Sequence, residues 1–155
     1  MFKGIDAVDK AIIEMLQRDS RASYAEIGRR VGRPESTVRY RVKKLLERGV
    51  IIRFTVLVRP EKIGLPVTSV VMIKSSPDRM EEIFEKISSM REALHVMQST
   101  GEYDILTVLH TRDIGHLNSI ENELRSTPGI KDVVVRVATG KLKIEYDLEP
   151  QITSD

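Results

Sequence analysis

Residues Ser23–Arg48 have the sequence SYAEIGRRVGRPESTVRYRVKKLLER, around which the rest of the chain is organised. Ser23 and Glu26 have the spacing of a capping box, in which the hydroxyl accepts from a backbone amide and the carboxylate reaches back, so a helix is expected to begin there. Gly32 tolerates the positive φ at which helices often end. Pro34 has a fixed φ that suits the first turn of a following helix. The stretch therefore predicts two short helices joined by a tight turn.

The second of these helices is expected to bury an apolar stripe and to expose a cationic face. The stripe has helical spacing and consists of Val38, Val42, Leu45 and Leu46. The other positions hold short polar, basic and aromatic side chains: Ser36, Thr37, Arg39, Tyr40, Arg41, Lys43, Lys44 and Arg48. A solvated helix usually mixes charges to gain i,i+4 pairs, yet no acidic residue lies between Ser36 and Lys44. Short polar residues at a helix start, followed by Arg and Tyr, suit contact with base edges and phosphates.

The distribution of charge supports DNA binding over the alternative, a basic surface helix in an ordinary helical hairpin. Residues 1–60 hold 14 Lys and Arg against 7 Asp and Glu, a net charge of +7. Residues 61–155 hold 11 against 16, a net charge of −5. The cations therefore gather around the basic helix, as phosphate binding requires. A membrane surface fits less well, because this helix lacks a broad aromatic or leucine face.

The composition is that of a globular protein and excludes several kinds of site. The 155 residues, 41% hydrophobic and 31% charged, fit one domain or two small ones. Because there is no cysteine, disulfides, thiolate metal sites and cysteine nucleophiles are excluded. No apolar run approaches the roughly 20 residues of a membrane span, and the acids in the first ten residues do not fit a signal peptide. A cytoplasmic protein is the expectation.

The segments around the opening stretch predict an N-terminal domain of three helices. A further helix is expected over Ala7–Arg18, and Gly49 is expected to end the last one. The three helices would enclose a small core of Ile12, Ile13, Leu16, Ile27, Val31, Val38, Val42 and Leu45. The β-branched segment Val50–Pro60 predicts a strand, either a wing or an arm between two domains, and the turn-rich segment 60–66 marks a boundary.

Beyond residue 66 the hydrophobic period alternates between that of strands and that of helices. Strands are expected over Val67–Lys74, Leu94–Ser99, Asp104–His110, Ile130–Val137 and Leu142–Leu148, and helices over 80–90 and 114–124. The order βαββαβ is that of a ferredoxin-like sandwich. The expected fold class is α+β, with a winged-helix-like helix-turn-helix domain over 1–50, an arm and linker over 51–66, the ferredoxin-like domain over 67–150 and a tail over 151–155.

Two runs of this second domain are apolar on both faces of the expected sheet. They are Val70–Ile73 and Val133–Val135. Two helices cover only one face of a four-stranded sheet, so a second copy of the sheet is the simplest cover for the other. We therefore expect a homodimer through sheet faces, with Val50–Pro60 arms crossing between subunits. The alternative is that these are central strands with a helix above and a loop below.

The motifs along the chain follow a recognisable order. They are Asp6, Asp9, Ile12-Ile13 and 16–21 in the first helix, Ser36–Leu45 in the third, Gly49-Val50-Ile51 after it, and later Thr100–Asp104 and Pro128-Gly129-Ile130. A basic helix-turn-helix, a β arm and a ferredoxin-like domain with these motifs resemble the Lrp/AsnC (leucine-responsive, feast/famine) family of prokaryotic transcription regulators. The resemblance covers nearly the whole chain.

The resemblance implies that the third helix lies in the major groove of double-stranded DNA, at successive half-sites of an imperfect palindrome. Base or nearby phosphate contacts are implied for Ser36, Thr37, Arg39, Tyr40 and Arg41. Phosphate contacts are implied for Arg21, Ser23, Tyr24, Lys43 and Lys44. The chain departs from its relatives at Arg33-Pro34, where they often have Leu-Ser, and this removes an N-cap hydroxyl. Arg33 is expected to compensate as a phosphate contact.

The resemblance also implies that the C-terminal domain binds an amino acid, at contacts between dimers that assemble into octamers. The implied site consists of Thr100, Gly101, Tyr103 and Asp104. Gly101 would let backbone amides hold a carboxylate, and Asp104 would pair with an α-ammonium group. From the residues alone, this loop also fits an ordinary hairpin turn that Asp104 caps.

Catalysis is not expected from this sequence. The histidines are His95, His110 and His116, no two of them have metal-ligand spacing, and there is no Gly-rich phosphate loop. We therefore expect no metal and no cofactor, and a sequence-specific transcription regulator modulated by an amino acid. One alternative is an architectural DNA-binding protein without an effector. Another is a stand-alone metabolite sensor or assembly module, against which the +7 half of the chain argues.

Overall fold

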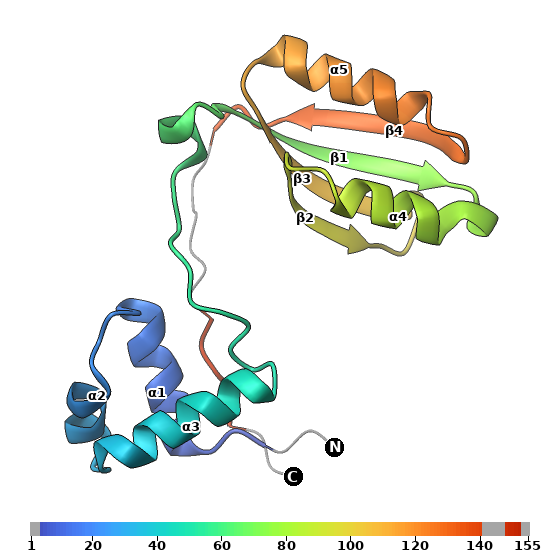
Figure 1. Cartoon of the computed structure of the whole chain (residues 1–155). Coiled ribbons are helices and arrows are strands. Elements are labelled where there is room, and N and C mark those ends of the chain that lie inside the picture. The colour runs from blue at the N-terminus through green and yellow to red at the C-terminus, as the bar shows by residue number, and fades with distance from the viewer. Residues whose placement is uncertain (1–3, 141–147, 153–155) are drawn as a thin grey trace. The chain divides into compact units, whose positions relative to one another are not determined.

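The computed structural model describes residues 4–140 and 148–152, and the chain divides into two compact units (Figure 1). The helical unit comprises Met1–Val56 with Lys143–Asp155, and the sheet unit comprises Leu57–Leu142. The fold class is α+β, as the sequence predicted. Apart from Leu148, the strand predicted over Leu142–Leu148 lies outside the described residues.

The helical unit contains three helices: α1 (Ala7–Arg18), α2 (Tyr24–Val31) and α3 (Glu35–Glu47). Asp6 begins α1 by accepting hydrogen bonds from two amides of its first turn, at 2.8 and 2.9 Å. Ser23 begins α2 by accepting from the Glu26 amide at 3.2 Å. Left-handed glycines follow two helices, with φ 65 at Gly32 after α2 and φ 69 at Gly49 after α3. The three predicted helices are confirmed, and so are the predicted roles of Ser23, Gly32 and Gly49 at their ends.

The three helices of this unit share one core. It includes Ile12, Leu16, Ile27, Val38, Val42 and Leu45. Residues 148–152 also belong to the helical unit, because Gln17 of α1 exchanges two hydrogen bonds with the backbone of Leu148, at 2.9 and 2.7 Å. Lys10 Nζ lies 3.0 Å from Glu149 Oε1, and this hydrogen bond raises the pKa of Lys10. These contacts join the C-terminal end of the chain to α1.

The strand predicted over Val50–Pro60 is wrong for the described chain. Residues 52–59 have neither helix nor strand, and a short 3-10 helix, η1 (Pro60–Ile63), follows. No backbone hydrogen bond joins residues 52–58 to any other described residue. Their β-branched side chains favour an extended backbone, but a strand needs a neighbour to satisfy its amides and carbonyls. Four apolar side chains are more than half exposed here: Ile52, Val56, Leu57 and Val58.

The sheet unit contains four antiparallel strands: β1 (Val67–Ser75), β2 (Ala93–Gln98), β3 (Ile105–Thr111) and β4 (Ile130–Val137). A 3-10 turn, η2 (Pro77–Arg79), and α4 (Met80–Ser88) link β1 to β2, and α5 (Ile114–Arg125) links β3 to β4. The strand order is β2-β3-β1-β4. This arrangement confirms the ferredoxin-like topology, with each element within two residues of its predicted bounds.

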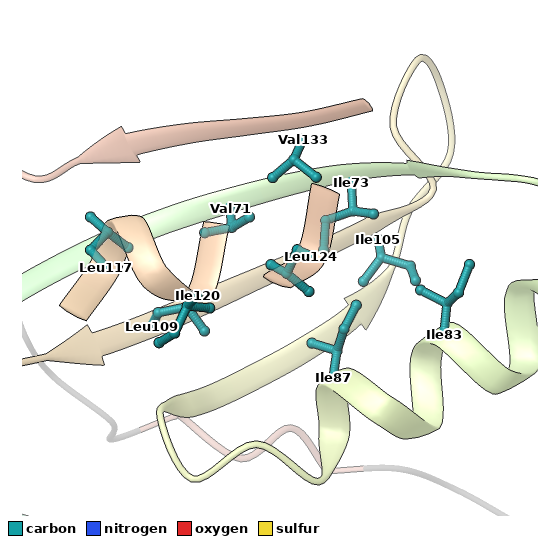
Figure 2. Close-up of a cluster of buried hydrophobic side chains, with 10 residues drawn as sticks. All are labelled: Val71, Ile73, Ile83, Ile87, Ile105, Leu109, Leu117, Ile120, Leu124 and Val133. Carbon is teal, nitrogen blue, oxygen red and sulfur yellow. The ribbon is translucent and has the colours of Figure 1, made fainter. Parts of the chain in front are cut away.

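One face of the sheet, together with α4 and α5, holds the core of this unit. Alternate residues of a strand lie on opposite faces, and those of one face pack with the two helices (Figure 2). The buried cluster consists of Val71, Ile73, Ile83, Ile87, Ile105, Leu109, Leu117, Ile120, Leu124 and Val133.

The opposite face of the sheet, called the open face below, is also apolar. At its centre Met72 pairs in register with Leu106 on β3 and with Val134 on β4. Val70 on this face is 41% exposed, and Met97, which pairs with Leu106, is 50% exposed. Neither α4 nor α5 covers this side. The prediction of strands with apolar residues on both faces is confirmed, and the homodimer remains a prediction.

Candidate nucleic-acid interface

The turn between α2 and α3 depends on two glycines. Gly32 ends α2 in the left-handed region, at φ 65 and ψ 39. Arg33 N donates to the Gly28 carbonyl at 2.9 Å, and a Cβ at Gly28 would lie 2.5 Å from the Arg33 carbonyl oxygen. A side chain at position 28 would therefore force the turn open. The sequence pattern identifies Gly32 but not Gly28, because the close approach involves a residue beyond the end of the helix.

The start of α3 differs slightly from the prediction. Pro34 is the residue before the helix, at φ −57 and ψ 149, rather than part of its first turn. Its carbonyl accepts from the Thr37 and Val38 amides, at 3.0 and 3.2 Å. No side chain caps α3, so the predicted loss of an N-cap hydroxyl at Arg33-Pro34 is confirmed. An uncapped helix start with free amides suits an anion such as a phosphate.

One side of α3 presents most of the predicted DNA contacts to solvent. The exposed residues are Ser36, Arg39, Tyr40, Lys43 and Lys44, whereas Thr37 is half-buried. The side chains of Arg39 and Lys43 are 65% and 74% exposed. Arg33, in the turn, is exposed as well. The predicted residues therefore form one continuous polar and basic surface along α3.

Ion pairs within α3 hold these cations in place. Arg39 Nη2 lies 2.6 Å from Glu35 Oε1, and Lys44 Nζ lies 2.8 Å from Glu47 Oε2. The hydrogen bond to Glu47 raises the pKa of Lys44. The Arg39 guanidinium also lies 5.3 Å from the centre of the Tyr24 ring. Exposed pairs of this kind contribute only about 0–1 kcal/mol, so DNA phosphates can replace the carboxylates at little cost.

Arg41 lies apart from this surface. Its Nη1 lies 2.6 Å from Asp6 Oδ2 and 2.9 Å from Asp9 Oδ1, and its side chain is 27% exposed. The hydrogen bond to Asp6 is the main cause of a raised pKa at Arg41. Partial burial pushes the pKa of Asp6 upward, but the Asp9 amide and the Arg41 guanidinium outweigh it and lower that pKa from its ordinary value. The structure thus engages Arg41 with α1.

The other predicted phosphate contacts lie around the start of α2. Arg21 is exposed, and its amide and Nε bind Asp19 Oδ1 at 2.9 and 3.4 Å. The bond from the Arg21 amide lowers the pKa of Asp19. Ser23 Oγ is occupied as the cap of α2, and Tyr24 is half-buried. Of these residues, Arg21 has the charge and exposure that a phosphate contact needs.

Two basic residues of α2 were not singled out by the sequence reasoning. Arg29 and Arg30 lie in the last turn of α2, immediately before the turn that leads to α3, and both are exposed. Among the described residues, neither has an ion-pair partner. Their adjacency to Arg33 in the sequence was the available signal. They add two exposed cations close in sequence to Arg33 and the start of α3.

The loop predicted to bind an effector connects β2 to β3. Gly101 has φ 107, so a residue with a side chain would be strained there. Thr100 and Gly101 are exposed, whereas Tyr103 is half-buried and its hydroxyl donates to Asp132 Oδ2 at 3.4 Å. Burial, followed by the charges of Glu102 and Asp132, raises the pKa of Tyr103.

Asp104 holds the base of this loop. Its Oδ2 accepts from the Ser75 amide at 2.8 Å and lies 3.3 Å from the Ser75 hydroxyl. Its own amide donates to the Ile73 carbonyl, and its carbonyl accepts from the Ser99 amide. The structure therefore brings the four predicted residues together in one loop, and the Asp104 carboxylate binds Ser75 at the end of β1. A ligand would have to use the other carboxylate oxygen.

The described residues also bear on metal, membrane and histidine chemistry. No group of three or more His, Asp or Glu side chains among them is arranged to hold a metal ion. None of the described helices has the length and hydrophobicity of a membrane span. His110 Nδ1 lies 3.1 Å from Thr68 Oγ1 in the sheet, and His116 Nε2 lies 3.3 Å from Glu92 Oε1. These two histidines have local partners and no arrangement typical of catalysis.

Sequence comparison places both halves of the chain among known domains. The profile of the AsnC-type helix-turn-helix domain matches residues 5–46, and that of the Lrp/AsnC ligand binding domain matches residues 68–148. HTH-type transcriptional regulator FL11 of Pyrococcus abyssi is 35% identical over 127 residues, 82% of this chain and 84% of that protein. An uncharacterized HTH-type transcriptional regulator of Pyrococcus furiosus is 35% identical over 143 residues, 92% of this chain and 97% of that protein.

Solved structures share the fold over almost the whole chain. AsnC of E. coli matches with a TM-score of 0.86 and 24% identity, over 94% of this chain and 99% of that one. An AsnC family transcriptional regulator from Agrobacterium tumefaciens matches with a TM-score of 0.83 and 27% identity, over 92% and 95%. A transcriptional regulator from Neisseria meningitidis, solved as a complex with L-Met, matches with a TM-score of 0.84 and 23% identity, over 92% and 95%.

Proposed function

Since the chain belongs to the Lrp/AsnC family of helix-turn-helix transcriptional regulators, we propose that it binds palindromic DNA sites sequence-specifically as a homodimer and responds to an amino acid. It combines a DNA-binding helix-turn-helix with a ligand-binding domain. Its relatives are regulators of transcription and not enzymes. The proposal adds three things to family membership: sequence-specific binding to DNA, a homodimer, and an amino acid as the class of ligand.

The exposed side of α3 is the observation that carries the proposal. It presents Ser36, Arg39, Tyr40, Lys43 and Lys44 beside an uncapped helix start. Arginine suits bidentate contact with guanine in the major groove, and short hydroxyl side chains suit either base edges or phosphates. Lysines further along the helix, together with Arg29, Arg30 and Arg33, suit the phosphates on either side of the groove. This division of roles is that of a recognition helix.

A homodimer through the open face explains the apolar side of the sheet. A large exposed apolar surface is more often an interaction site than a surface that stays in contact with water. The same face of a second copy is complementary to it by symmetry, because two-fold interfaces use the same patch on both subunits. A two-fold dimer carries two recognition helices, which call for palindromic half-sites about one DNA turn, or a multiple of it, apart. Contacts between such dimers would build the octamer implied by the family resemblance.

The loop of Thr100, Gly101, Tyr103 and Asp104 is the proposed amino-acid site. The exposed Thr100 and Gly101 leave backbone groups accessible to a carboxylate. Asp104 supplies a negative charge at the base of the loop, with Oδ2 engaged by Ser75. The L-Met complex of the Neisseria relative supports an amino acid as the class of ligand.

One experiment tests these parts in order. The full-length protein is used to select duplexes from a random-sequence pool, and the affinity for the selected duplex is then measured with each of the twenty amino acids. We expect a palindromic motif, and one or a few amino acids that change the affinity. Asp104→Asn keeps an acceptor for the Ser75 amide but removes the charge, so we expect it to bind the duplex normally and to lose the response.

Two results would contradict the proposal. Enrichment of no particular sequence would favour an architectural DNA-binding protein. An amino-acid response that persists unchanged in Asp104→Asn would remove Asp104 from the site while leaving the DNA-binding function intact.

A further inference from the structure

Arg41 lies on the side of α3 that faces α1. Its guanidinium binds two carboxylates of the α1 region through one nitrogen, at 2.6 Å from Asp6 and 2.9 Å from Asp9. Its side chain is 27% exposed, against 65% for Arg39 and 74% for Lys43. Successive residues of a helix are about 100° apart, so Arg39 and Lys43, each two residues from Arg41, both lie on the opposite side of α3.

Both carboxylates that bind Arg41 are themselves fixed. Asp6 Oδ1 accepts from the Val8 and Asp9 amides and so begins α1, which leaves Oδ2 for Arg41. Asp9 lies in the first turn of α1 and is 7% exposed. A buried carboxylate is costly unless it is paired. Moving Arg41 out to a DNA phosphate would leave Asp9 buried without a charge partner.

A second arginine on the same side of α3 also contacts the start of the chain. Arg48 lies seven residues after Arg41, about two helical turns further on, and its Nη2 donates to the Gly4 carbonyl at 3.1 Å. Residues 4–9 therefore contact Arg41 within α3 and Arg48 directly after its end. Apolar packing is not directional, whereas these hydrogen bonds are, so they fix the rotation of α3 about its own axis.

From these contacts we infer that Arg41 is a positioning residue for DNA recognition and not a DNA contact. Held by Asp6 and Asp9, it sets the rotation at which α3 presents its exposed side, including Arg39 and Lys43. The inference rests on the proposed DNA-binding function and adds a role for two acidic residues of α1. The charges agree with it, because two carboxylates already oppose the positive charge of Arg41 and leave little attraction for a phosphate.

Removing a carboxylate distinguishes the two roles by its effect on the ratio of the affinities for a selected and a random-sequence duplex. If Arg41 bound DNA, Asp9→Asn would release it and remove a negative charge, so affinity for any duplex would rise. If Arg41 positions α3, Asp9→Asn loosens α3, and affinity for the selected duplex falls relative to a random-sequence duplex of the same length. We expect this ratio of affinities to fall about tenfold, the effect of one mismatched base pair. Partial unfolding would lower both affinities alike and leave the ratio unchanged.

The salt dependence of binding gives a second readout with a matched control. Each phosphate contact contributes about −0.9 to the slope of log K against log salt concentration. We expect Arg41→Ala to keep the wild-type slope and to lower the affinity ratio. Lys43→Ala, on the exposed side of α3, is expected to reduce the magnitude of the slope by about 0.9 per protomer and to keep the ratio.

Fluorescence anisotropy on the full-length protein measures both quantities. Two results would overturn the inference and leave the proposed function standing: a slope that falls in Arg41→Ala as it does in Lys43→Ala, or an affinity that rises by the same factor for both duplexes in Asp9→Asn. A wild-type protein that binds neither duplex would overturn the proposed function, and the inference with it.

Discussion

The helical unit and the sheet unit differ in how they cover their apolar side chains. In the helical unit, α1, α2 and α3 turn their apolar stripes toward one core, and the far side of α3 is polar and basic. In the sheet unit, α4 and α5 cover one face, while the open face around Met72 remains apolar. One chain therefore supplies the whole basic surface of α3, whereas covering the apolar open face would require a second chain, as in the proposed dimer.

Met72→Arg is expected to disrupt the proposed dimer of the sheet unit, and this is the largest of the expected effects. Met72 lies between Leu106 and Val134 at the centre of the open face. In a dimer through this face, the new guanidinium would be buried without a partner, which costs about 3–5 kcal/mol. We expect a monomer in sedimentation experiments at concentrations where the wild-type protein is a dimer. Affinity for a palindromic duplex should fall as well, because the two helix-turn-helix units are no longer linked.

The matched control for this change is Ile114→Arg. Ile114 is also apolar and is 50% exposed, but it begins α5, on the covered side of the sheet. We expect this variant to remain a dimer and to bind DNA with unchanged affinity. A Met72→Arg protein that stays dimeric would place the interface elsewhere, and the open face would then need another explanation.

Gly28→Ala is expected to damage the helical unit alone, with an intermediate effect. The new Cβ would lie 2.5 Å from the Arg33 carbonyl oxygen, so the turn between α2 and α3 must shift. Overpacking of this kind costs about 1–3 kcal/mol. Hydrogen–deuterium exchange on the full-length protein should accelerate in α2 and α3 and stay unchanged in β1 and β3. Gly115→Ala, a helical glycine of the sheet unit, is the control, and acceleration of α2 in that variant would show that exchange in α2 does not report on the turn at Gly28 alone.

The elements with local signals were predictable from the sequence. The bounds of α1 agree with the prediction at both ends, because apolar periodicity and the capping residue Asp6 lie within the helix and just before it. The left-handed Gly32 and the missing cap at Pro34 are likewise local properties of one or two residues. The exposed side of α3 follows from the same periodicity that defines its buried stripe.

What the sequence did not predict depends on residues that are distant in the chain. Arg41 looks like its basic neighbours until Asp6 and Asp9, 35 and 32 residues earlier, are placed beside it. Asp104 and Ser75 are 29 residues apart. The segment 52–59 has side chains typical of a strand. A strand also needs hydrogen bonds to a second segment, and the propensity of one segment does not show whether such a partner is present. The sequence therefore predicts the helices and most strands, but not which distant residues contact one another.

The charge of Asp6 makes the stability of the helical unit depend on pH, and this is the smallest of the expected effects. The pKa of Asp6 in the folded helical unit is lowered from its ordinary value of 3.8 by the Asp9 amide and Arg41, which together outweigh burial. A carboxyl with a lowered pKa stabilises the fold above its unfolded pKa, and this stabilisation is lost as the pH falls through the folded value. Asp6→Asn keeps a good N-cap, but it removes the charge and the oxygen that accepts from Arg41. We therefore expect it to destabilise the helical unit at pH 7 by less than about 1 kcal/mol, because the Asp6 side chain is 54% exposed. Urea unfolding followed by circular dichroism should show the difference beginning to shrink near pH 3.8 and disappearing as the pH falls through the lower pKa of folded Asp6. In an Arg41→Met background, Asp6→Asn should change the free energy of unfolding only slightly at pH 7. A change as large as in the wild-type background would show that Arg41 does not contribute to the stabilisation.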